Sequence, residues 1–143
     1  MSIDPVVVLA EELRSTEYDL RDATDKQLGG TVSSLVRKIR GICRELAETT
    51  PTSALGASEL VRLAAEHLPA THAHYTRHLS EIADRLGAGE RQHPDLVWLR
   101  AITAAFEGGL CEESGAKAAV LIRLAIAGAA RPVVVYRAVI CPA

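Results

Sequence analysis

Apolar positions recur at steps of three and four residues along most of the chain. The first stripe of this kind consists of Val6, Leu9, Leu13, Thr16 and Leu20. Charged residues such as Glu12 and Arg14 fall off that stripe. Asp4 is a good N-cap, and Pro5 suits the first helical turn. The spacing therefore predicts an amphipathic helix that begins at Asp4.

The second stripe is the most regular in the protein. It consists of Leu28, Val32, Leu35, Ile39, Ile42 and Leu46. This strict spacing is typical of a helix that packs along its length on near-parallel neighbours. Thr24 and Asp25 are the candidate caps of this second helix. Because both stripes are long and their connection is short, we expect the first two helices to form an antiparallel hairpin.

Proline and threonine residues divide the next part of the chain into two shorter helices. Pro51 disfavours helix at the residue before it, and Thr52 or Ser53 is placed to cap a third helix. Pro69 ends that helix, and Thr71 is the candidate cap of a fourth. The glycines that follow residue 86 supply the stop of the fourth helix.

The C-terminal third predicts two further helices and a tail. Pro94 stands at the start of a fifth helix, and a sixth covers Glu113 to about Ala129. The β-branched run of the tail, residues 131–143, is compatible with an extended arm or with a short helix that starts at Pro132. We therefore expect a single all-α domain over residues 1–143, a bundle of five or six helices with an extended or helical C-terminal tail.

Composition agrees with this fold class and narrows the cellular setting. The 143 residues are 48% hydrophobic but only 3% aromatic, with a net charge of -2. This charge gives no bulk attraction to nucleic acid. The most apolar window, residues 116–130, contains Lys117 and Arg123, so no membrane span is expected. Cys43, Cys111 and Cys141 are odd in number and widely spaced, which favours reduced thiols in a cytoplasmic protein.

A cluster of histidines is the most distinctive candidate for chemistry. Four of the five histidines fall between His67 and His78. His74, His78 and Glu81 share one helical face, and two imidazoles with a carboxylate make a reasonable transition-metal set. The Glu-x-x-His and His-Glu-x-x-His patterns of known metal bundles and proteases are absent. The simpler interpretation is that these histidines lie on the surface or at the edge of the buried face. The alternative is a metal site.

Other functional patterns are weak. The surroundings of His74 and His78 do not match those of histidine phosphotransfer domains. The segment around Arg37, Arg40 and Arg44 is locally basic, but acidic residues follow it, which favours a solvated face over a nucleic-acid site. The chain has no Gly-x-Ser-x-Gly motif and no phosphate-binding loop.

One short segment resembles a known group of proteins. Residues 50–57 form a Thr-Pro-Thr-Ser-Ala-Leu-Gly-Ala turn, and residues 60–67 continue as Leu-Val-Arg-Leu-Ala-Ala-Glu-His. This stretch resembles small bacterial helical proteins of unknown function. The resemblance implies a bacterial origin and an all-α fold, and it implies no activity.

These patterns predict a non-enzymatic helical protein that forms a homodimer and acts in protein interaction or regulation. The sixth helix and the Val-rich tail carry more apolar surface than a monomer of this size usually exposes. The hairpin face or the tail would then contact the mate or another protein. The alternative is a bundle that binds a metal or small ligand through His74, His78 and Glu81.

Overall fold

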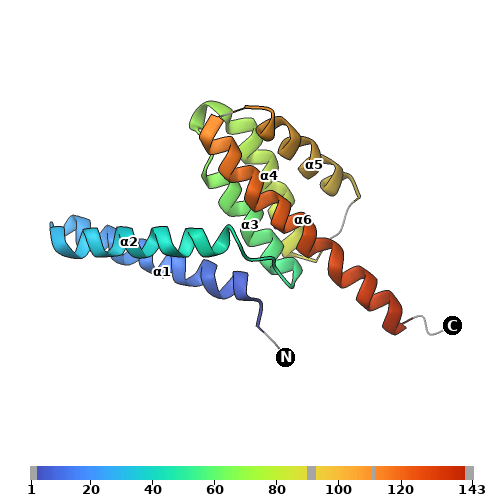
Figure 1. Cartoon of the computed structure of the whole chain (residues 1–143), viewed down its shortest axis with the longest axis horizontal. Coiled ribbons are helices and arrows are strands. Elements are labelled where there is room, and N and C mark those ends of the chain that lie inside the picture. Colours follow the sequence, from blue (N-terminus) through green and yellow to red (C-terminus); the bar gives the residue numbers. More distant parts are fainter. Residues whose placement is uncertain (1–2, 90–92, 111, 141–143) are drawn as a thin grey trace.

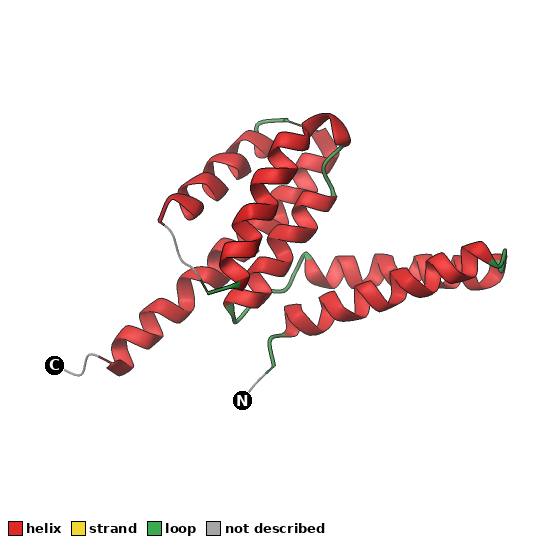
Figure 2. Cartoon of the chain, turned by 180° about the vertical axis from the view of Figure 1, so that it is seen from behind, coloured by secondary structure: helices red, strands yellow, loops and turns green. Residues whose placement is uncertain are grey.

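The part of the chain that the structure describes is almost entirely helical. The computed structural model describes residues 3–89, 93–110 and 112–140, with the side chains of all of them except 93–94 and 130–140. These residues form six α-helices, no strand and one 3-10 turn (Figures 1 and 2). Their bounds are α1 Pro5–Asp25, α2 Gly29–Leu46, α3 Ala54–Glu66, the turn η1 Ala70–His72, α4 Ala73–Gly87, α5 His93–Glu107 and α6 Glu112–Ile140. The predicted all-α class is confirmed.

The helices are arranged as a hairpin and a four-helix body. α1 and α2 lie side by side and antiparallel, as the sequence predicted, and they project from the body formed by α3, α4, α5 and α6 (Figure 1). Within the body, α3 packs against α4 and α6, and α5 packs against α6. The hairpin joins this body through contacts between α1 and α3. One half of the hairpin therefore has a neighbour, and the other half extends away from the body.

The core lies mainly within the four-helix body. Its largest fully buried side chains there are Leu60, Leu79, Ile82, Leu99, Phe106 and Ile122. They come from all four body helices, so each helix buries one apolar stripe against its neighbours. None of the described helices combines the length and apolar character needed to cross a membrane.

Asp4 joins the start of the hairpin to the start of the body. Its Oδ1 accepts a hydrogen bond of 3.0 Å from the backbone N–H of Val6, which confirms the predicted N-cap. Its Oδ2 accepts bonds from the backbone N–H groups of Thr52 and Ser53 and from the Ser53 hydroxyl, at 3.1, 2.9 and 2.5 Å. Ser53 in turn caps α3 by accepting from the N–H of Gly56. One buried carboxylate thus fixes two helix N-termini.

Glycine is required where Pro51 packs between α3 and α6. A Cβ added to Gly128 would overlap the ring and carbonyl oxygen of Pro51, and one added to Gly56 would overlap the Asp4 carboxylate. Both helices therefore approach this junction more closely than any side chain would permit.

Two predicted caps are wrong. Thr24 and Asp25 do not start α2, because α1 continues through both of them and the Thr24 hydroxyl donates to the carbonyl of Leu20. The chain reverses at Gln27, whose φ is 57°, and α2 begins at Gly29 without a side-chain cap. Thr71 lies inside the turn η1, so α4 begins two residues later. Thr24, Asp25 and Thr71 thus lie within helical turns and do not precede them.

The C-terminal tail is helical over its described residues, 131–140. α6 continues without a break from Glu112 through Pro132 to Ile140, so its extended-arm alternative is not what the structure shows. The tail is also not a separate seventh helix. A proline inside a helix removes one backbone hydrogen bond and disfavours the helix around it, yet α6 runs through Pro132. The side chains of residues 131–140 lie outside the described part, and their docking to a mate stays a prediction.

Candidate functional site

The predicted histidine cluster packs against aromatic rings. His74 lies on α4 with its ring centroid 4.0 Å from that of Tyr75. His78 meets Trp98 of α5 edge-on, with centroids 5.1 Å apart. Glu81 is exposed to solvent. Of these three residues, His78 contacts α5, whereas His74 and Glu81 are exposed.

This arrangement offers little support for the metal-binding alternative. Among the described side chains, no three His, Cys, Asp or Glu residues lie close enough together to hold a metal ion. Nε2 of His78 is buried and has no hydrogen-bond partner within that same part of the chain. A metal site at His74, His78 and Glu81 stays a prediction that the fold does not strengthen.

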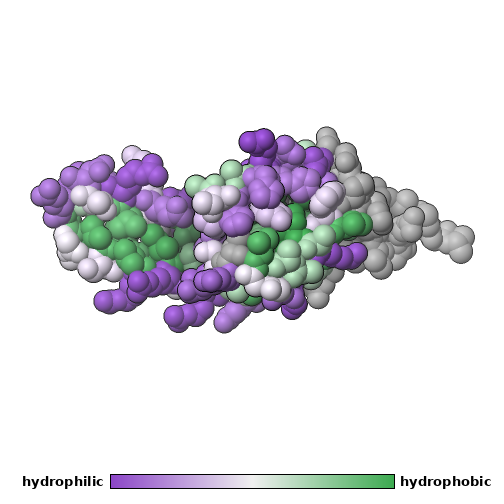
Figure 3. Space-filling view, turned by 90° about the horizontal axis from the view of Figure 1, so that it is seen from above, coloured by the Kyte–Doolittle hydropathy of each residue, from purple (hydrophilic) through white to green (hydrophobic). Residues whose placement is uncertain are grey.

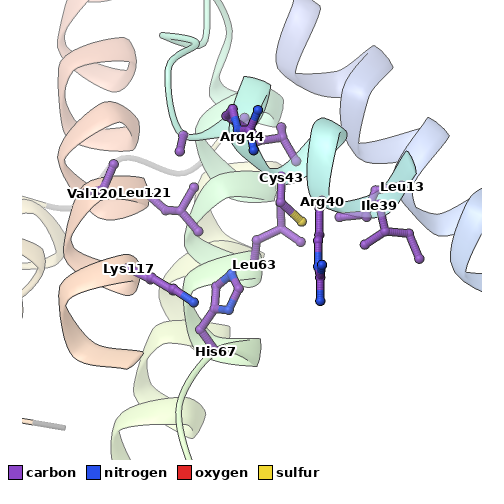
Figure 4. A pocket seen from close by; sticks show the side chains of 12 residues that line it. Leu13, Ile39, Arg40, Cys43, Arg44, Leu63, His67, Lys117, Val120 and Leu121 are labelled. Carbon is purple, nitrogen blue, oxygen red and sulfur yellow. The ribbon is translucent and has the colours of Figure 1, made fainter. Parts of the chain in front are cut away.

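A cavity of about 580 Å³ lies where the hairpin meets the body (Figure 4). This volume falls in the usual range for small-molecule sites. Its apolar lining comes from both halves of the structure and consists of Leu13, Ile39, Cys43, Leu46, Ala47, Leu63, Val120 and Leu121. The remaining lining residues are all basic or imidazole side chains, namely Arg40, Arg44, His67 and Lys117. The cavity therefore combines an apolar wall with a cationic edge.

The imidazole of His67 lies at this edge beside Lys117. Burial lowers the pKa of His67 below its ordinary value of 6.5, and the nearby ammonium group of Lys117 lowers it further. In Figure 4 the side chains of Lys117 and His67 point toward each other. His67 is therefore mainly neutral at pH 7, and the permanent charges at the edge are those of Arg40, Arg44 and Lys117.

Cys43 lies in the wall of the same cavity as a free thiol. Burial raises the pKa of Cys43 above its ordinary value of 9.0, and Glu17 raises it further against the opposing effect of Lys117. A thiolate is the nucleophilic form of cysteine, so at neutral pH this thiol should react more slowly than an ordinary exposed cysteine. Cys111 and Cys141 lie outside the described residues.

The projecting half of the hairpin leaves an apolar face uncovered. Figure 3 looks down on the side of the hairpin from which the body rises, and hydrophobic residues gather there between two hydrophilic rims. Of the apolar stripe predicted for α2, only Ile42 and Leu46 are buried. The other positions keep part of their surface in water, and Leu28 is 47% exposed.

The sequence pointed to single members of the cavity but not to the cavity. Arg40 and Arg44 are exposed, as expected for a solvated face, and they also border the same cavity as Ile39. Lys117 stood out only as a charge within an apolar window. Their common location depends on where the hairpin crosses α3 and α6, which no local pattern encodes.

No protein-family model, curated protein or solved structure matches this chain. Its function therefore has to be inferred from the geometry and chemistry of its own residues.

Proposed function

We propose that this protein is a non-enzymatic, dimer-forming helical protein whose projecting hairpin contacts the hairpin of a second copy. The observation that carries the proposal is the uncovered apolar face of α1 and α2. The proposal concerns the physical role of the chain, as an interaction or regulatory module built on its own dimer.

The apolar face of the hairpin continues past the part that the body covers (Figure 3). In a two-helix hairpin, each helix buries only part of the apolar surface of the other. The rest stays exposed unless a second layer of helices packs on the hairpin. The body supplies that second layer for the half of the hairpin next to it, formed by the start of α1 and the end of α2. Leu13, Ile42 and Leu46 are buried there. Val32, Leu35 and Val36 continue the apolar positions into the projecting half, where they are only partly buried. Burying such surface contributes roughly 25 cal/mol per Å².

Charge favours a second copy as the occupant. α1 carries six acidic and two basic side chains, a net charge of -4. α2 carries four basic side chains and one acidic, a net charge of +3. A face with one acidic and one basic rim is complementary to itself, because a mate turned to place its α1 over α2 pairs opposite charges. Two hairpins packed in this way form a four-helix arrangement.

The test is the oligomeric state of Val36→Glu. Light scattering coupled to size-exclusion chromatography should show a dimer for the unchanged protein. Val36→Glu places a carboxylate in the proposed contact. We therefore expect the dissociation constant of the dimer to rise at least about tenfold. Circular dichroism checks that the variant stays helical.

Val97→Glu is the matched control. Val97 is an apolar residue on α5 that is 49% exposed and far from the hairpin face. This variant should remain dimeric. A monomeric unchanged protein at high micromolar concentration would refute the proposal, as would equal weakening of the dimer by both substitutions.

A further inference from the structure

We infer that the cavity between the hairpin and the body binds a single-chain anionic amphiphile, such as a fatty acid. The acyl chain would lie against the apolar wall, and the anionic head group would meet the basic edge. This site does not include His74, His78 or Glu81, and it adjoins the proposed dimer face at Ile39.

The wall has the chemistry of an acyl-chain site. Ile39 and Cys43 come from α2, Leu63 from α3 and Leu121 from α6, so aliphatic groups face the space from several directions. No Phe, Tyr or Trp is among the residues that line it. A flexible aliphatic chain needs only an apolar surface of this kind.

The edge has the chemistry of an anion site. Four of the lining residues are Arg40, Arg44, His67 and Lys117, and none of the described lining residues is acidic. Arg40 and Arg44 form no ion pair with another described residue, so their donors are available to a carboxylate or phosphate. Lys117 lies 3.3 Å from Glu113, but that pair is exposed on both sides and exchanges readily.

Two effects oppose an anion here, and the cations exceed both. The C-terminal ends of α2 and α3 lie at this edge, and each carries a partial charge of about half an electron. Glu17 is near enough to raise the pKa of Cys43, although it does not line the cavity. The three permanent positive charges exceed the two helix ends and Glu17 together, which amount to about two negative charges. A cationic or metal ligand finds no carboxylate among the lining residues.

Isothermal titration calorimetry with defined short-chain amphiphiles tests this assignment. Decanoate should bind about fifteenfold more tightly than octanoate, because each added methylene gains about fourfold. Decanoate should also bind at least about tenfold more tightly than decanol, which lacks the charge. Decyltrimethylammonium should not bind. Comparison of decyl phosphate with decanoate distinguishes a phosphate head group from a carboxylate. The anion that binds more tightly identifies the preferred head group, and either order supports the site.

A matched pair of variants locates the binding. Arg44→Gln removes one edge cation and should weaken decanoate about tenfold. Arg123→Gln removes a cation of α6 that is paired with Glu107 and does not line the cavity, so it should leave decanoate binding unchanged.

Alkylation of Cys43 gives a second readout. Bound decanoate should slow the modification of this thiol, measured on its own peptide by mass spectrometry. Absence of decanoate binding would overturn the assignment. Equal affinities for decanoate and decanol, equal effects of the two arginine variants, or unchanged alkylation would overturn it as well.

Discussion

Asp4 shows how one side chain can fix two distant parts of the chain. Its carboxylate is buried and accepts hydrogen bonds from the start of α1 and from the segment just before α3. The sequence predicted the first of these roles from the Asp-Pro pair. The second role joins residues about fifty positions apart and required the folded structure.

We therefore expect Asp4→Ala to destabilise the protein by about 3 kcal/mol, because it removes a cap and leaves the N–H groups of Thr52 and Ser53 without their acceptor. Asp4→Ser keeps a cap for α1 but is too short to reach α3. It should cost about 1 kcal/mol less than Asp4→Ala. Urea unfolding followed by circular dichroism measures both, and equal losses would mean that the α1 cap contributes nothing.

Cys43 gives the protein a predictable response to alkaline pH. Burial and Glu17 raise its pKa in the folded state, whereas the thiol of the unfolded chain ionises near 9.0. Above that pH the unfolded state loses a proton that the folded state keeps, so this group lowers stability as pH rises.

The variant Cys43→Ala isolates this contribution. At pH 7 it should cost about 1 kcal/mol of packing. At pH 10 the deficit should be smaller, since only the unchanged protein carries the ionisation penalty. Paired urea titrations at the two pH values measure the difference, and a deficit independent of pH would contradict the assigned cause.

At the scale of elements, a buried ion pair attaches α5 to α4. Nε and Nη2 of Arg85 donate to the two carboxylate oxygens of Asp95 at 2.9 and 2.7 Å. Asp95 lies in the first turn of α5, and its side chain is only 4% exposed. The carboxylate thus holds the start of α5 against the end of α4.

Arg85→Ala should cost about 3 kcal/mol, because it leaves this buried carboxylate without the arginine. The control is Arg62→Ala, which removes the exposed pair between Arg62 and Asp84 at 3.1 Å. That change should cost less than about 1 kcal/mol. Thermal unfolding of both variants measures the contrast, and similar losses would show that burial does not determine the value of these pairs.

The tail illustrates how an element's neighbours determine its conformation. Its β-branched residues were compatible with a strand, but the described part of the chain contains no strand that could pair with it. α6 instead continues through Pro132, because a helix satisfies its backbone groups internally. Local propensity was therefore overruled by the lack of a ladder partner.

At the scale of the whole molecule, both proposals arise where the hairpin leaves the body. The body covers only part of the hairpin face, and the uncovered part is the proposed dimer contact. The junction itself encloses the cavity. Light scattering tests the dimer, and isothermal titration calorimetry tests the ligand site. One proposal can therefore fail without the other.

The sequence by itself determined the helices, their approximate bounds, the hairpin and the first cap, because these depend on the period of apolar residues and on local capping chemistry. Only the tertiary structure brought Arg40, Arg44, His67 and Lys117 to one cavity, placed Asp4 beside Ser53 and left half of the hairpin uncovered. These features depend on the angle and position at which helices cross. Crossing geometry is set by packing among residues far apart in the chain, and a stripe of apolar positions shows which side is buried without showing by what.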